Sequence, residues 1–298
     1  MPHQDHLCRG LVPRSGLRAS FVRISDTARM ARVLHGLYPA AALVFGEALA
    51  AGALLGSLQK DSGRINLQLE CDGPLAGLLV DGDADGNVRG YVRRPEVHFP
   101  GDPAAAARAA LGQAGFLSVI RDHGGGHFYR SSVKLEAMDL AGDLRRWFES
   151  SEQVATAFDL AVVPSADGAE PLGEVAGLVI QRLPDGDDAA VAAARARLAA
   201  GALPAALRRG ATAHEILTEV AGNPFELLAD QEVAYRCGCS KQRARVAVSS
   251  LGVDGIADVL QNEKQAVITC EFCRERYVID EAELREIQAK LSEQQADG

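Results

Sequence analysis

The spacing of apolar residues predicts two consecutive helices near the start of the chain. Residues 24–58 place apolar side chains three and four positions apart, which is the period of a helix with a buried face. Pro39 interrupts this segment. Because proline lacks a backbone donor and restricts the residue before it, we expect one helix to end there and another to begin. Ser25 or Asp26 can provide the N-cap of the first helix.

From residue 64 onward the period changes to two, which is typical of half-buried strands. Ile65, Leu67 and Leu69 alternate with polar residues, and similar segments recur further along. The expected strands cover residues 65–69, 75–80, 88–92, 116–120, 127–136, 158–163 and 177–183, with helical patterns at 103–114 and 140–157. Because the strands come in groups and do not alternate strictly with helices, we predict an α+β fold.

The chain divides into three predicted parts. Residues 1–184 form a large N-terminal domain of mixed sheet and helix. Residues 185–230 form a helical, metastable linker. Within it, 189–210 is dominated by alanine, which favours helix but offers few large side chains to bury, whereas 213–229 is more amphipathic. Residues 231–298 form a small C-terminal domain that ends in a charged helix.

The formal net charge of −9 argues against one broad class of function. Proteins that hold nucleic acid through phosphate contacts need a basic surface, or at least a basic stripe. We therefore expect no nucleic-acid partner.

The sequence predicts neither export nor a membrane span. Residues 1–8 lack a basic start followed by an apolar run, so we expect no secretory signal and a cytoplasmic protein. The apolar segment 38–58 contains Glu47 and three glycines, and we interpret it as a buried core helix. Residues 11–16, LVPRSG, look like a protease-cleavage tag, but the flanking sequence continues smoothly and we treat them as native.

Four of the six cysteines form two close pairs near the C-terminus. Cys237 and Cys239 are separated by one residue and Cys270 and Cys273 by two, with residues 240–269 between the pairs. In a reducing cytosol, such clustering indicates metal or redox chemistry rather than a disulfide framework. Four soft ligands in two close pairs match a tetrahedral four-thiolate site. We predict one Zn²⁺ ion bound by all four.

Basic residues around the cysteines favour a redox-sensitive metal site over a purely structural one. They would offset the negative charge of four thiolates on one divalent ion, and they would keep freed thiols reactive. An equally good interpretation is that they are ordinary solvated surface. They are Arg236, Lys241, Arg243, Arg245, Arg274 and Arg276.

Each cysteine pair can also close on itself. Residues two or three apart lie within or near the Cα range of a disulfide, and Gly238 adds backbone freedom. Because metal and disulfide compete for the same sulfurs, forming Cys237–Cys239 and Cys270–Cys273 would eject the ion. Structural zinc contributes about 10–16 kcal/mol in small peptides, whereas closing such short loops contributes only about 1.6–1.9 kcal/mol each. Losing the metal should therefore unfold so small a domain.

Taken with these cysteines, the chain closely resembles the redox-regulated heat-shock holdase family, also called the 33 kDa chaperonin family. The Cys-x-Cys and Cys-x-x-Cys pairs match its zinc switch, including their wide separation. Upstream segments also look like family signatures, in the family's order: Phe45-Gly46-Glu47, Asp72-Gly73-Pro74-Leu75, Val88-Arg89-Gly90 and Ser151-Glu152-Gln153. The resemblance covers essentially the whole chain.

The resemblance implies an ATP-independent chaperone rather than an enzyme. It implies that the reduced, zinc-bound form is inactive and that peroxide or hypochlorite, together with unfolding stress, converts the ligands to two disulfides. Cys270 and Cys273 would oxidise first. The linker would then unfold, and the protein, often as a homodimer, would bind unfolded clients and prevent their aggregation. The alanine-rich linker departs from the more charged segment expected of the family.

Other motifs have simpler interpretations. The acidic run 81–86 resembles the start of a calcium loop, but Val92 stands where the bidentate acid belongs, so a polar hairpin turn is expected. The glycine-rich run 123–127 is interpreted as a flexible hairpin connection. Cys8 and Cys71 stand alone, and Cys71 fits core packing.

Two rival functions stay open from the residues alone. A static zinc module that serves a protein or nucleic-acid partner would keep its metal in the presence of oxidants. A dithiol–disulfide enzyme would turn over a substrate such as insulin, but the Cys-x-x-Cys pair lacks the strand–helix setting of a thioredoxin-like site.

Overall fold

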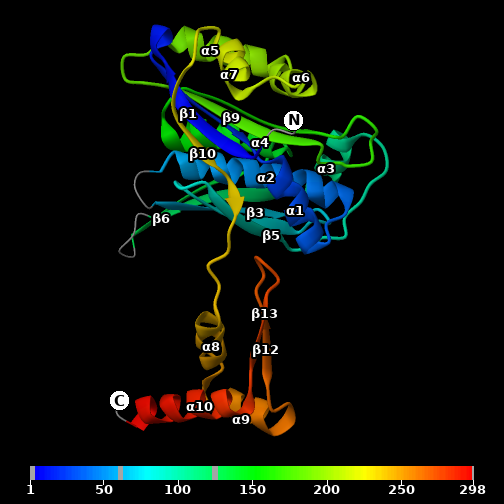
Figure 1. Ribbon diagram of the computed structural model, residues 1–298, viewed down its shortest axis with the longest axis vertical. Coiled ribbons are helices and arrows are strands. Elements are labelled where there is room, and N and C mark those ends of the chain that lie inside the picture. The colour runs from blue at the N-terminus through cyan, green and yellow to red at the C-terminus, as the bar shows by residue number, and fades with distance from the viewer. Residues whose placement is uncertain (1–3, 60–62, 123–126, 297–298) are drawn as a thin grey trace. The chain divides into compact units, whose positions relative to one another are not determined.

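The computed structural model describes residues 4–59, 63–122 and 127–296 (Figure 1). Internal contacts divide the chain into two units, Met1–Arg236 and Cys237–Gly298. Helices and strands follow one another irregularly, with strands in groups. The predicted α+β class is confirmed.

Two sheets lie on either side of helix α2 (Pro39–Ser57) in the first unit (Figure 1). The first has the strand order β10-β1-β2-β9-β8 and the second β11-β5-β4-β3-β6-β7. The short β11 runs parallel to β5, and the other paired strands are antiparallel. The strands are β1 His6–Val12, β2 Leu17–Arg23, β3 Arg64–Cys71, β4 Gly77–Asp83, β5 Asn87–Val92, β6 Gly115–Asp122, β7 Phe128–Lys134, β8 Thr156–Val163, β9 Glu174–Arg182, β10 Glu226–Glu232 and β11 Ala234–Tyr235.

The first sheet is covered on both faces. This explains why the alternation of apolar and polar residues did not predict strands β1 and β2. Leu7 and Val22 belong to the core around α2, whereas Cys8 and Phe21 belong to the core on the opposite face. Because neither face meets water, polar residues do not mark alternate positions. The tag-like segment 11–16 forms the end of β1 and the turn into β2, as an integral part of this sheet.

The two helices predicted on either side of Pro39 are confirmed as α1 (Ser25–His35) and α2. The predicted cap is wrong, since neither side chain proposed for it caps α1. The carboxylate of Asp5 accepts hydrogen bonds from the backbone N–H groups of Asp26 (3.0 Å) and Thr27 (2.6 Å) instead. A residue outside the helix therefore satisfies its first donors.

Two further helices complete the first unit's core. α3 (Pro103–Leu111) confirms one prediction. The helix expected over 140–157 is shorter: it consists of α4 (Leu140–Trp147) and a π-helical turn, Phe148–Glu152, because β8 already begins at Thr156.

The acidic run 81–86 covers the end of β4 and the turn into β5, so the predicted polar hairpin turn is confirmed. The Asp83 carboxylate accepts hydrogen bonds from the backbone N–H groups of Asp85 (3.0 Å) and Asn87 (2.9 Å). These bonds fix an ordinary polar turn. Residues 123–126 of the other predicted connection lie outside the described residues.

Helix α2 is buried almost throughout, as the sequence predicts for 38–58. By length and apolar composition alone it could cross a membrane, and so could α5 (Asp188–Ala199) with α6 (Ala202–Arg208) if that bent pair were one span. In α2, 94% of the most apolar window is buried inside the protein. A helix that is apolar all round belongs in a core of this kind.

The ionisable residue within α2 gives a testable pH dependence. Burial, assisted by the charges of Asp139 and Asp159, raises the pKa of Glu47 to about 8. The folded state therefore holds a proton that the unfolded chain releases near pH 4.5, so stability falls as the pH rises from about 5 to about 8. In Glu47→Gln, we expect the free energy of unfolding to lose part of its dependence on pH, on the order of 1–3 kcal/mol. The melting temperature of this variant should therefore change less with pH.

Thermal melts of wild type and variant across that pH range measure the effect. The exposed Glu96→Gln is the matched control. Equal slopes in all three proteins would show that Glu47 is ionised in the fold.

Three helices cover the face of the first sheet opposite α2: α5 (Asp188–Ala199), α6 (Ala202–Arg208) and α7 (Ala213–Ala221) (Figure 1). Arg195 donates to the carbonyl of Thr156 at 2.8 Å, which ties α5 to β8. The apolar side chains that pack beneath the helices are Val191, Ala194, Leu198, Leu203, Ala206, Leu207, Ile216, Leu217 and Val220. The alanine-rich segment is thus helical where it is docked. That this linker is metastable, and that the chain divides at 184 and 230, stay predictions.

The end of the predicted helical linker is a strand. Residues Glu226–Glu232 form β10 and pair with β1 along the edge of the first sheet. Gly10 permits this approach, because a Cβ atom there would lie 2.0 Å from the carbonyl oxygen of Glu226. A bulge opposite Arg9 and Gly10 leaves Leu228 without a partner in the ladder, and its side chain is 68% exposed. Leu228 therefore contributes little to the core of the first unit.

The second unit is small. Its core contains Ala244, Val248, Ile256, Ala266, Ile279, Leu284 and Ile287. Its elements are α8 Lys241–Ser249, α9 Gly252–Asn262, β12 Ala266–Thr269, β13 Arg276–Ile279 and α10 Glu281–Ala296, the last being the predicted charged helix. So few buried side chains leave little stability to spare.

Candidate metal centre

The first cysteine pair lies in an extended segment just before α8. Cys237 and Cys239 are half-buried, and Ser240 follows as the N-cap of α8, accepting a hydrogen bond from the backbone N–H of Arg243. The cap fixes the direction in which the chain enters the helix. The pair is therefore held at a defined point of the second unit.

The second pair lies in the tight turn between β12 and β13. The backbone N–H of Cys270 donates to Glu275 and that of Arg274 donates to Cys270, both at 2.9 Å. Arg274 has a left-handed backbone (φ 58°), which is unusual for a residue with a side chain. The turn places Cys270 and Cys273 on one side of the hairpin end.

The fold brings all four sulfurs together. Every Sγ atom lies within 4.8 Å of the other three. Two sulfur contacts in the cluster join different pairs: Cys237 to Cys270 at 3.7 Å and Cys239 to Cys273 at 3.2 Å. In a tetrahedral site with bonds of about 2.3 Å, neighbouring sulfurs are about 3.8 Å apart. The cluster could hold a metal ion, and its donors suit a soft or borderline cation.

Two features of the cluster were not foreseen from the sequence. The hydroxyl of Tyr277 lies 3.1 Å from the Cys239 sulfur, within hydrogen-bond distance. Burial, assisted by the neighbouring thiols, raises the pKa of Cys273 to about 12. Since thiolates and not thiols bind metals, a cation would have to displace this proton. The tyrosine's position on β13, four residues after Cys273, was the only sequence signal.

Three of the six basic residues near the cysteines pair with carboxylates. Lys241 and Arg245 both pair with Glu283 at 2.8 Å, and Arg274 pairs with Glu271 at 2.9 Å. Their charge is partly neutralised by these partners. The expectation that all six basic residues offset the thiolates is therefore too simple.

Comparison with known proteins covers almost the whole chain. A family model described as "Hsp33 protein" matches residues 5–280. A protein named "33 kDa chaperonin" from Geobacter sp. (strain M21) is 34% identical over 98% of this chain and 99% of its own. One of the same name from Bacillus subtilis (strain 168) is 31% identical over 94% and 97%.

A solved structure agrees with these matches. The crystal structure of the 33 kDa chaperonin (heat shock protein 33 homolog) from Thermotoga maritima has a TM-score of 0.85 and 26% sequence identity. It covers 98% of this chain and 100% of that one. The similarity thus extends through both units.

Proposed function

Because the chain belongs to the Hsp33 family and is a chaperone of that family, we propose that it is a redox-regulated, ATP-independent holdase. Cys237, Cys239, Cys270 and Cys273 are both its Zn²⁺ ligands and its redox-active residues. The reduced, zinc-bound form is inactive. Oxidation releases the metal, loosens the linker and exposes a surface for unfolded proteins.

The observation that carries this proposal is the direction of the sulfur contacts. Contacts from Cys237 to Cys270 and from Cys239 to Cys273 join the segment before α8 to the β12–β13 turn. A bound zinc ion supplies four such cross-connections at once. A disulfide within either pair joins only residues that are close in the chain. Oxidation therefore replaces zinc–sulfur bonds that hold the unit together with disulfides that do not.

Peroxide is the oxidant in the redox step. Each pair of zinc-bound thiolates gives up two electrons to form one sulfur–sulfur bond, and one H₂O₂ takes up these electrons and two protons from solvent to become two molecules of water. The family resemblance favours Cys270–Cys273 as the first pair to react. With both disulfides formed, no thiolate ligand remains for the metal.

Unfolded proteins are the proposed partners, and the cytoplasm is the proposed compartment. The linker helices α5–α7 cover mostly apolar side chains on the first sheet. Undocking them would expose apolar surface on both the helices and the sheet, which is what an unfolded client can bind. A homodimer of the oxidised chain would double this surface.

The proposal is tested by following zinc and aggregation together. The full chain is treated with peroxide under mild heating, a chromogenic chelator reports the released metal, and light scattering follows a denatured client without ATP. We expect about one zinc ion per chain to be released as scattering is suppressed. Peptide mapping should find the two predicted disulfides.

Two results would contradict the proposal. Oxidised protein that sheds zinc without protecting the client is not a redox-activated holdase. Metal that stays bound in peroxide, with unchanged partner binding, would favour the static zinc module instead.

A further inference from the structure

A second cluster of metal-binding side chains lies in the first unit, far from the four cysteines in sequence. It forms where β1 meets β10 at the edge of the first sheet. Cys8 and Asp230 are directly opposite each other in the ladder. His6 lies two residues before Cys8, so both side chains project from the same face of β1. The register therefore makes the three side chains neighbours.

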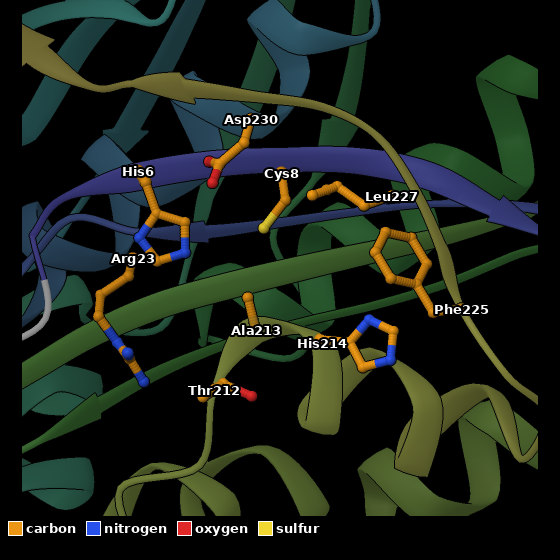
Figure 2. A pocket seen from close by; sticks show the side chains of 9 residues that line it. All are labelled: His6, Cys8, Arg23, Thr212, Ala213, His214, Phe225, Leu227 and Asp230. Atoms are coloured by element: carbon orange, nitrogen blue, oxygen red, sulfur yellow. The ribbon is translucent and has the colours of Figure 1, made fainter.

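The ligand atoms of these three residues converge. One nitrogen of His6, the Cys8 sulfur and a carboxylate oxygen of Asp230 all lie within 4.8 Å of one another. Figure 2 shows the His6 ring beside Cys8, with Asp230 above both. A nitrogen, a sulfur and an oxygen at this spacing are a donor set for a borderline divalent cation such as Zn²⁺ or Co²⁺.

The histidine is oriented as a ligand would be. Its Nδ1 lies 2.8 Å from the backbone carbonyl oxygen of Gln4. Because a carbonyl oxygen can only accept, Nδ1 carries the proton and Nε2 keeps its lone pair. Metal-binding histidines are commonly held in this way, with the second ring nitrogen donating to a carbonyl.

The cluster borders a cavity of about 270 Å³ between the sheet edge and the start of α7, where Thr212, Ala213 and His214 line it (Figure 2). Cys8 is buried at 4% exposure, whereas Asp230 is exposed. An ion could therefore enter from solvent past the carboxylate and reach the sulfur inside. The cavity also leaves room for a water molecule as a fourth ligand.

The buried Arg23 lines the same cavity and its charge acts on Cys8, but that charge is shared with other partners. The Nε of Arg23 pairs with Glu174 at 3.2 Å, and its Nη2 donates to the carbonyl of Ala211 at 3.0 Å. Its guanidinium extends away from Cys8 in Figure 2.

We propose that His6, Cys8 and Asp230 form a second site for a Zn²⁺-class divalent cation. Asp230 lies on β10, directly after the linker helices, and the other two ligands lie on β1 in the sheet. A bound ion would clamp the exit of the linker to the sheet. Occupancy of this site therefore strengthens the docked state of the linker, separately from the four-cysteine cluster.

The test counts Co²⁺ ions on the reduced full chain by native mass spectrometry. We expect Asp230→Asn and His6→Ala to hold one ion fewer than wild type, and their affinity at this site to fall by at least tenfold. Cys8→Ala should also lose the absorption that one thiolate contributes to bound Co²⁺. His214→Ala, which lines the cavity without belonging to the cluster, and Cys71→Ala are the controls and should bind as wild type.

The difference between wild type and variants decides the matter even if the four-cysteine cluster binds no ion. Equal ion counts in wild type, Asp230→Asn and His6→Ala would overturn the proposal. Circular dichroism identifies any variant that fails to fold. As a second readout, added Zn²⁺ should slow hydrogen exchange in β10 of wild type but not of Asp230→Asn, and no slowing in wild type would exclude the clamp.

Discussion

The Cys239→Ser variant is expected to lose its zinc and to unfold across residues 237–298, while the first unit stays folded. Three sulfurs remain, but the contact between Cys239 and Cys273 is lost. The second unit's small core cannot replace a metal whose binding contributes about 10–16 kcal/mol. Zinc content and hydrogen exchange resolved by peptide measure the two effects.

The control for this experiment is Cys71→Ser. This cysteine lies on β3 in the first unit and takes no part in either cluster described here. It should retain zinc and protection throughout. If Cys239→Ser kept slow exchange across 237–298 after losing its metal, the second unit would not depend on zinc, and the proposed switch would lack its cause.

The Leu217→Ala variant is expected to loosen the linker without touching the cysteines. Leu217 lies on α7, is 0% exposed and packs in the core between the helices and the first sheet. Its truncation should destabilise the docked helices by about 2–5 kcal/mol. Hydrogen exchange across α5–α7 should speed up, and the oxidised protein should suppress client aggregation at a lower temperature than wild type.

Leu228→Ala is the matched control, since it removes the same atoms from a side chain that is 68% exposed. Its effect should stay within about 0.5 kcal/mol. Two results would contradict the interpretation. Equal exchange in both variants would mean that Leu217 does not hold the linker. Faster hydrogen exchange with unchanged chaperone activity would mean that undocking of the linker does not control client binding.

The sequence predicted the site whose residues form a recognisable motif of closely spaced positions. Cys237 and Cys239, like Cys270 and Cys273, are close in the chain, and thiols at such spacing have few uses in a reducing compartment. The cluster of His6, Cys8 and Asp230 carries no such signal. Its members meet only because β10 returns to the edge of β1, and that pairing depends on a strand that the sequence indicated as helix.

The wrong predictions about secondary structure have a similar cause. The segment 213–229 is amphipathic enough for one helix, but α7 ends at Gly222, which adopts a left-handed backbone (φ 73°). The cap of α1 comes from Asp5, a residue that precedes β1 and that no local rule connects with α1. The periodicity of apolar residues identifies helices and strands that have one face exposed to solvent. It does not find elements or caps that tertiary contacts decide.

The strand order of the first sheet has a consequence for how the proposed switch would reset. The linker leaves the sheet after β9 and rejoins it at β10, so both of its ends are anchored in the same sheet. An undocked linker is therefore a closed loop of about forty residues rather than a free tail. Its helices stay at a high effective concentration, on the order of millimolar, beside their own binding face. Recovery after reduction is thus a local search, independent of protein concentration, in which the linker competes directly with any bound client.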